Sequence, residues 1–365
     1  MQRQTHKIGC CDRKRIFRSP LVGVAMLHIV SNDIAAYRLK KSGLPGIVLS
    51  WRDSLNEGPV LSGVPLETLS GIRARHLADN GWCDYASAIE EFANRDNCLK
   101  KYYEHDEVIL WFGNDLSDQF QLLQLLEWFS NQDLDETYLR LISPSITAGR
   151  AVLRSIGSLQ GVQLLSLFHN RAVVNDAQFA LARHGWKSFC SSNPRAIEEL
   201  LTQDTSALPY LRPTMQRHLE QFPAVGVGLC RTTRQILQAV KSGVKEPDAI
   251  MAIAEMNETP RFLAEPLFWA YVQSLTRGPR PLLCTAAGEM FHAPERNPSY
   301  TDPEYQELKL TRDGQAVIEH RADAIALNGI DRWRGGVYLN HRYPYWCWDP
   351  SEKQMTRVET TVAQY

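Results

Sequence analysis

Short apolar runs that end abruptly in polar residues recur in the first part of the chain. The runs 26–30, 46–51 and 107–112 are rich in β-branched and other strand-forming residues, which is typical of strands. Apolar residues three or four positions apart predict helices at 34–41, 66–78, 85–103 and 120–128, and another short strand is expected at 138–142. This alternation of strands and helices predicts a parallel, Rossmann-like sheet with right-handed crossovers.

A different pattern begins near residue 145. An additional edge strand is expected at 162–167, and helical periodicity runs from Asp176 to the region of Leu200. Helices are predicted at 211–222, 232–240, 247–256 and 262–275, followed by strand-like runs at 282–285, 308–311, 336–339 and 346–348. Residues 308–318 resemble the strand, turn and helix that end many winged-helix domains.

The chain is therefore expected to be an α/β protein with a Rossmann-like domain at 26–145, a mainly helical connector at 146–210 and a winged-helix-like α+β region at 211–365. Residues 1–25 hold six Lys or Arg residues against Asp12 alone and show no helical periodicity. We interpret them as a disordered basic extension, or as sequence upstream of a true start at Met26.

Polar loops that directly follow three of the predicted strands define the candidate site. These loops are residues 31–33, 52–59 and 113–119. Because the carboxyl ends of parallel strands meet at one edge of an open sheet, we expect the loops to share one crevice. The candidates are Asp53 and Asp115 as catalytic groups, and Asp33, Arg52, Glu57, Gly58, Asp118 and Gln119 as ligand-binding residues.

The acidic residues of these loops have two interpretations. Converging carboxylates can hold Mg²⁺ or Mn²⁺, which clamps phosphate or activates water, and a single carboxylate can act as a general base. Alternatively, Asp33 and Asp115 cap the helices that follow, Asp118 lies in a first helical turn, and Glu57 only shapes the turn at Gly58. The sequence contains neither a Walker A motif nor a GxGxxG loop.

Four residues within or directly before these loops have further interpretations. Arg52 is suited to holding an anionic group in a bidentate manner. His28 lies inside a strand, where a hydrogen-bonded core histidine is the favoured interpretation. Trp51 and Trp111 end equivalent strands, and core packing is favoured over a role as pocket walls.

 Basic residues gather between positions 205 and 245. Glu220 is the single acidic residue in that stretch, whose basic members are Arg212, Arg217, Arg231, Arg234, Lys241 and Lys245. Such an excess beside a winged-helix-like pattern suits contacts with nucleic-acid phosphates, for which Arg231 and Arg234 are the candidates. Winged-helix folds also serve in protein interactions, and arginines on a helix usually form a solvated face. DNA binding is therefore one alternative.

Composition sets few further limits. Hydrophobic residues make up 44% of the chain and charged residues 22%, which is ordinary for a globular protein. No apolar run is long enough to predict a membrane span. The eight cysteines include no CxxC pair, which argues against a zinc site and suits buried thiols in a reducing cytoplasm, the expected location.

Near the C-terminus, the stretch 328–337 is dense in turn-forming and polar residues. Gly335-Gly336 predicts a tight turn before a strand, and Asp331 and Arg332 are expected to pair structurally.

Together these elements resemble an uncharacterised bacterial family, domain of unknown function eighteen thirty-five, from Met26 to the C-terminal region. The matching segments are 27–33, 51–59, 111–119 with the leucine-rich helix that follows, and 326–337. Asn32 departs from the pattern, because a glycine is expected there. The family has no established activity, so the resemblance implies the fold and the site but no reaction.

The leading hypothesis is a domain that binds a phosphate-bearing or nucleotide-like ligand in an acidic crevice, with metal-assisted hydrolysis as the candidate reaction. One alternative is a transcription regulator in which the crevice senses a ligand and the winged-helix-like region binds DNA. Another is a non-catalytic scaffold for protein interactions.

Overall fold

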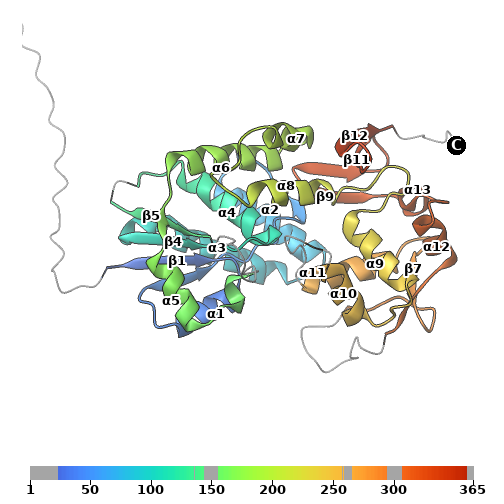
Figure 1. Cartoon of the computed structure of the whole chain (residues 1–365), viewed down its shortest axis with the longest axis horizontal. Helices are drawn as coiled ribbons and strands as arrows, with labels where there is room; N and C mark the ends of the chain where they lie inside the picture. The colour runs from blue at the N-terminus through green and yellow to red at the C-terminus, as the bar shows by residue number, and fades with distance from the viewer. Residues whose placement is uncertain are drawn as a thin grey trace, which may run out of the picture.

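The computed structural model describes residues 24–134, 136–143, 155–256, 258, 265–293 and 306–359. The expected basic extension therefore lies almost wholly outside the described residues. Figure 1 shows a parallel sheet with helices on both faces at one end of the molecule, and a second, mainly helical region with short strands at the other. No helix among the described residues is long and apolar enough to cross a membrane.

The larger sheet has the strand order β2-β1-β4-β5-β6. Strands β1 (Met26–Val30), β2 (Ile47–Ser50), β4 (Glu107–Trp111) and β5 (Tyr138–Ile142) run parallel to their neighbours. The short edge strand β6 (Ala172–Val173) is antiparallel to β5. The predicted parallel sheet is thus confirmed.

Alternating side chains of the central strands feed two cores. In β1 and β4, the side chains of Leu27, Ile29, Val108 and Leu110 face the larger core. Those of Met26, Val30, Ile109 and Trp111 face the smaller one. Helices α4 (Leu116–Phe129) and α6 (Asp176–Phe189) cover the first face. Helices α1 (Asp33–Lys41) and α5 (Gly161–His169) cover the second, as Figure 1 shows. Burial on both faces explains the nearly continuous apolar runs of these strands.

A helical hairpin follows β2 and the short strand β3 (Gly58–Pro59). It consists of α2 (Leu66–Asp79) and α3 (Tyr85–Lys100), which precede a 3₁₀ turn at Tyr102–Glu104. Leu69 and Leu99 of this hairpin reach the larger core.

Two local expectations were wrong. Residues 162–167 belong to helix α5 instead of an edge strand, because their apolar run suits either element and a capping box between Gln160 and Gln163 starts a helix. Asn32, not Asp33, is the N-cap of α1: its side chain accepts from the backbone N–H of Ala35. Strand β6 belongs to the parallel sheet, and helices α5 and α6 pack on it. The parallel-sheet unit therefore continues well past residue 145.

The second region is built mainly from helices. They are α7 (Arg195–Leu201), α8 (Leu211–Leu219), α9 (Arg231–Lys241), α10 (Pro247–Met256), α11 (Glu265–Leu275), α12 (Arg312–Ile318) and α13 (Ala324–Asn328). A 3₁₀ turn at Ile156–Ser158 lies outside this region, before α5 of the parallel-sheet unit. Strands β7 (Leu283–Thr285) and β8 (Leu308–Leu310) pair antiparallel after α11. Three helices and a strand pair occur in winged-helix domains too, but that assignment stays a prediction.

A small sheet joins the two regions. Strand β9 (Asp331–Gly335) pairs in parallel with β3 and antiparallel with β10 (Val337–Asn340). The tight turn expected at Gly335-Gly336 is confirmed, since Gly335 has φ +59° and a side chain on Gly336 would collide with the carbonyl of Cys190. A second hairpin, β11 (Tyr345–Asp349) and β12 (Gln354–Val358), follows.

Candidate functional site

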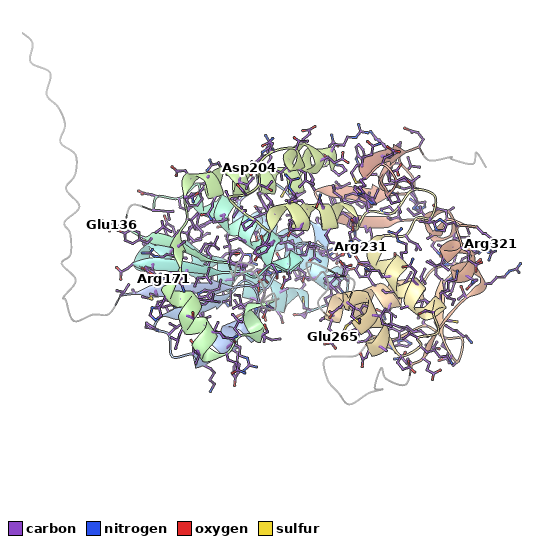
Figure 2. All side chains as sticks on the ribbon, viewed as in Figure 1. Glu136, Arg171, Asp204, Arg231, Glu265 and Arg321 are labelled. Carbon is purple, nitrogen blue, oxygen red and sulfur yellow. The ribbon has the colours of Figure 1, made fainter. Side chains whose placement is uncertain are left out.

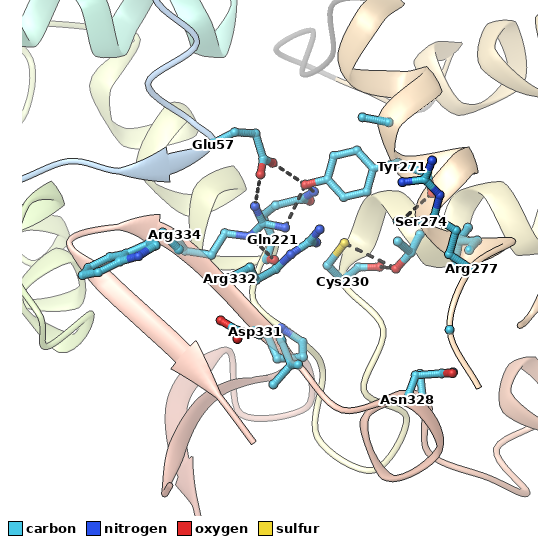
Figure 3. A pocket seen from close by; sticks show the side chains of 18 of the residues that line it. Glu57, Gln221, Cys230, Tyr271, Ser274, Arg277, Asn328, Asp331, Arg332 and Arg334 are labelled. Atoms are coloured by element: carbon cyan, nitrogen blue, oxygen red, sulfur yellow. Dashed lines mark hydrogen bonds and ion pairs between the residues drawn. The ribbon is translucent and has the colours of Figure 1, made fainter. Parts of the chain in front are cut away.

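A pocket of about 730 Å³ lies where the two regions meet. The parallel-sheet unit contributes Glu57 and Gly58 and the end of α2, and the other walls come from α11, the segment before α9, and the stretch from α13 through β9. Figure 3 shows Glu57 facing Tyr271 of α11 and Arg334 of β9. The pocket therefore exists only when the two regions are packed together.

Glu57, Tyr271 and Arg334 form a closed hydrogen-bonded triangle in the wall of the pocket. The Tyr271 hydroxyl donates to one oxygen of Glu57, and Arg334 donates through Nη1 to the other oxygen. Arg334 Nη2 also donates to the Tyr271 hydroxyl at 2.8 Å. All three residues are buried, so each charge or dipole depends on the other two.

The electrostatics follow from this burial. Burial disfavours the phenolate and raises the pKa of Tyr271 well above its ordinary value, so the hydroxyl keeps its proton. Burial alone would lower the pKa of Arg334, but the neighbouring Glu57 carboxylate and Tyr271 raise it. Arg334 is consequently a permanent cation in the protein interior.

The triangle continues into a longer buried chain of hydrogen bonds. Gln221 donates through Nε2 to the Tyr271 hydroxyl at 2.6 Å and accepts at Oε1 from Arg217 at 3.0 Å. Arg217 donates to both carboxylate oxygens of Glu258 at 2.8 Å. Since these groups are buried and paired, they fix how α8, α9 and α11 meet β9 and the loop at Glu57.

Two arginines at the pocket keep an uncompensated charge. Arg332 and Arg277 line the pocket, and neither side chain forms an ion pair or hydrogen bond within the described part of the chain. The guanidinium of Arg332 lies 5.6 Å from the ring centre of Tyr271. In Figure 3 the two arginines flank the Tyr271 side of the pocket. Both can therefore donate to a bound anion.

Other polar and aromatic groups complete the walls. The Tyr338 hydroxyl donates to Asp331 at 2.6 Å, and the rings of Trp333 and Tyr338 lie 5.0 Å apart. Asp331 is thus bound to Tyr338, and the expected pairing with Arg332 is not among the contacts of the described residues. Ser274 and Asn328 add further hydrogen-bonding groups.

His76 closes the pocket beside Gly58. Desolvation is the main reason that the pKa of His76 falls to about 4, so the ring is neutral at neutral pH. Its Nδ1 lies 3.2 Å from the Asn80 amide, and its Nε2 is buried with no hydrogen-bond partner among the described residues. Gly58 has φ +81°, and a Cβ there would collide with the His76 ring, so both its conformation and its neighbour require glycine.

The three candidate loops lie at one edge of the sheet, as expected. Strands β1, β2 and β4 are parallel, so their carboxyl ends, and the loops after them, face the same way. The side chains of the loops nevertheless occupy separate environments. Of the eight candidates, Glu57 and Gly58 line the pocket.

Asp53 has a buried structural partner. Arg73 of α2 donates to its carboxylate at 2.8 and 3.0 Å and also to the carbonyls of Ser54 and Glu57. Both side chains of this ion pair are only 1% exposed. Because Arg73 occupies the carboxylate, Asp53 organises the loop that carries Glu57 instead of facing the pocket.

The third loop is held by capping interactions. Asp115 is the N-cap of α4 and accepts from the backbone N–H of Asp118 at 2.9 Å. Asp118 is buried and accepts from Gly113 N–H, while Gln119 donates to the Gly113 carbonyl. Desolvation raises the pKa of Asp118, although hydrogen bonds from Ser31 and the Gly113 N–H oppose the shift. These side chains fix the loop.

The remaining candidates of the first two loops lie at the surface. Arg52 forms exposed ion pairs with Asp33 at 3.3 Å and Glu91 at 3.5 Å. Its backbone has φ +49°, which is uncommon for a residue other than glycine. Such exposed pairs contribute little to stability.

The interpretations of the strand residues are confirmed. Trp51 and Trp111 are fully buried. His28 accepts at Nδ1 from the Trp111 indole at 3.1 Å, which leaves Nε2 to donate to the Pro45 carbonyl at 2.9 Å. Burial is the main cause that lowers the pKa of His28, so it is a neutral core residue.

Most of the basic cluster at 205–245 is neutralised. Arg217 is buried against Glu258, and Arg231 pairs with Glu220 at 2.6 Å and Glu258 at 3.3 Å. Figure 2 places Arg231 in the middle of the molecule, near the junction of the two regions. Arg234 makes no ion pair within the described residues. No group of three His, Cys, Asp or Glu side chains within the described ranges is arranged to hold a metal ion.

The most informative residues of the pocket escaped the sequence analysis. Tyr271 lies in an ordinary apolar helical pattern, and Gln221 follows a helix without any motif. Arg332 and Arg334 did have a signal, because two arginines flank Trp333 in a strand next to Gly335-Gly336. Arginines at alternate positions of a strand, next to a glycine turn, can place a guanidinium group in the protein interior.

The comparisons leave the resemblance as a prediction. No protein-family model matches the chain, and a search of curated proteins finds no match either.

Proposed function

We propose that the pocket between the two regions binds a small phosphate-bearing, nucleotide-like ligand. The observation that carries the proposal is the pair Arg332 and Arg277, two guanidinium groups that face the pocket without a carboxylate partner among the described residues. Arginine presents several N–H donors in a planar fork that matches the oxygens of a phosphate. The third arginine, Arg334, is already neutralised by Glu57 and supports the wall.

The other pocket residues suit the rest of such a ligand. Trp82, Trp333 and Tyr338 offer aromatic surface to a flat ring, while Asn328 and Asp331 offer polar groups to a sugar or base. The volume of about 730 Å³ falls within the range of about 300–1,000 Å³ that is usual for small-molecule sites. The acids Asp53, Asp115 and Asp118 have structural partners, so the proposal is confined to binding and includes no hydrolytic step.

The regulator and the scaffold remain alternatives with less support. In a winged-helix interpretation of α9–α11, the third helix would be the one that enters the DNA groove. That helix, α11, buries Leu267, Phe268, Trp269, Tyr271, Val272 and Leu275. Ser274 on its more open side lines the pocket. The helix therefore presents a ligand pocket where a recognition helix would need a free face.

A thermal-shift panel tests the class of ligand. The panel contains adenosine 5′-monophosphate, adenosine 5′-triphosphate, pyrophosphate, citrate and uncharged adenosine. Ligands that bind only the folded state raise the melting temperature in proportion to ln(1 + [L]/Kd), so we expect a shift with the nucleotides and none with adenosine. Shifts of equal size with adenosine would contradict a phosphate-directed site, and no shift with any member at millimolar concentration would contradict the proposal.

A further inference from the structure

A second cavity, of about 1,150 Å³, lies along helix α9 on the side away from the pocket. Arg231, Arg234, Gln235 and Gln238 line this cavity, which we call the α9 groove. Their spacing of three, four and seven residues places them on one face of the helix. Thr233, on another face, lines the pocket instead. The two cavities are therefore separate sites that share one helix.

The α9 groove contains basic side chains without partners. Arg234, His320 and Lys353 line it, and none of their side chains forms an ion pair or hydrogen bond within the described part of the chain. Arg212 also faces the groove, and the carbonyls of Leu201 and Gln203 hold its guanidinium in place. Positive charge from α8, α9 and the β11–β12 hairpin thus converges on one cavity, which the imidazole of His320 also lines.

The backbone at two of these residues supports a role for their side chains. His320 has φ +58° and Lys353 has φ +52°, a conformation that favours glycine. In this region the Cβ of a residue other than glycine crowds the backbone, which carries a steric cost. His320 directly follows Glu319, the C-cap of α12, and Lys353 lies in the hairpin turn, so glycine would serve the local fold at either position. Instead both positions direct a basic side chain to the same groove.

Amide groups add hydrogen-bonding capacity. Gln216, Gln235, Gln238 and Gln354 line the groove, and their side chains make no hydrogen bond within the described residues. Each amide can both donate and accept. A ligand that combines phosphate with polar organic groups would use the arginines and the amides together.

The acidic residues of the groove limit the size of the ligand. Glu198, Glu220 and Glu352 lie among the basic residues, and Glu220 already pairs with Arg231. An extended polyanion such as duplex DNA would contact these carboxylates as well as the basic side chains. Repulsion between its phosphates and the carboxylates would weaken its binding. A compact anion needs only a few basic partners, and Arg234, Lys353 and Arg212 all line this cavity.

We propose that the α9 groove is a second ligand site, which binds a compact phosphate-bearing anion through Arg234 and Lys353, with Arg212 as a fixed donor. This site does not depend on the ligand proposed for the pocket, because different arginines serve each cavity.

Calorimetric titration with inorganic tripolyphosphate at low ionic strength tests this proposal. Arg234→Gln and Lys353→Gln should each weaken binding about tenfold, and the double variant should weaken it further. Arg38→Gln removes the same charge from an exposed position of α1 and should leave the affinity unchanged. In the Arg332→Gln background, where phosphate binding at the pocket is weakened, Arg234→Gln should still cause the same loss, which separates the two sites.

Three outcomes would overturn the proposal. One is an affinity of the Arg234→Gln and Lys353→Gln variants equal to that of the parent protein. Another is equal weakening by Arg38→Gln, which would reveal general charge attraction. The third is duplex DNA that binds more tightly than tripolyphosphate and depends on Arg234, because the occupant would then be an extended polymer. Circular dichroism of each variant shows that its fold is intact.

Discussion

Arg334 donates to the carboxylate of Glu57 across 277 positions of sequence, and both groups are buried. The pair joins the loop after the second strand of the parallel sheet to a strand near the C-terminus. Tyr271 from α11 completes the contact. The pocket is therefore built on a polar junction that holds three distant segments of the chain together.

Replacing Glu57 by Gln should destabilise the protein strongly. The change leaves the Arg334 cation buried without its counter-charge, and breaking a buried pair typically costs about 3–5 kcal/mol. The free energy of unfolding from urea titration measures the effect. The exposed Glu90→Gln, on α3, is the control and should change it little. A loss for Glu57→Gln as small as that of the control would show that the pair is not buried as described.

Asp53→Asn should behave as a stability variant. Its carboxylate balances the fully buried Arg73, so we expect a loss of about 3 kcal/mol in the free energy of unfolding. Asp115→Asn keeps an oxygen that can cap α4 and should cost well under about 1 kcal/mol. Urea titration of both variants tests the contrast. Equal stability of the two variants would contradict the structural role given to Asp53.

The sequence predicted the parallel sheet well because its central strands, β1 and β4, are buried on both faces and appear as continuous apolar runs. It also placed the three loops at one edge of that sheet, which follows from parallel strands alone. It could not show that Asp53 faces Arg73, since a carboxylate at a strand end has the same local pattern whether it binds a ligand or a buried arginine.

The pocket itself lay beyond sequence reasoning for a physical reason. Its walls come from segments whose contact depends on tertiary packing, such as Tyr271 against Glu57 and β3 against β9. The apolar run at 162–167 shows the complementary limit, because such a run suits a strand and a helix equally until its neighbours decide.

Gly58→Ala should distort the pocket wall. The positive φ of Gly58 alone costs an alanine about 1 kcal/mol, and the new methyl group would press on the His76 ring. We expect Gly58→Ala to lower the free energy of unfolding by more than that backbone cost. When His76 is already alanine, adding Gly58→Ala should cost less than it does in the parent protein. A double-mutant cycle of unfolding free energies measures this coupling. Additive losses would mean that the two residues do not touch.

The stability of the protein should fall as the pH drops below about 6.5. Burial, with help from Arg334 and Arg217, lowers the pKa of His218 to about 3, so the folded state keeps this ring neutral while the unfolded state takes up a proton. Between these two values stability decreases by at most about 1.4 kcal/mol per pH unit for this group. His76 contributes in the same direction.

His218→Phe tests the origin of this dependence. The ring packs against Phe120, Phe189 and Phe222, so phenylalanine suits its surroundings. The variant should show a shallower loss of unfolding free energy between pH 6 and pH 4.5. Replacing the exposed His292 by Gln should leave the slope as in the parent. An unchanged slope in His218→Phe would place the pH dependence elsewhere.

The most direct measurement of the central claim is calorimetric titration of adenosine 5′-monophosphate into the parent protein and into Arg277→Gln, Arg332→Gln and Arg342→Gln. Arg342 is exposed after β10 and does not line the pocket, so its variant is matched in charge change. We expect each of the two pocket variants to weaken binding at least tenfold, which corresponds to about 1.4 kcal/mol, while Arg342→Gln binds as the parent does. Parent-like affinity in both pocket variants, or the same weakening in Arg342→Gln, would contradict the account.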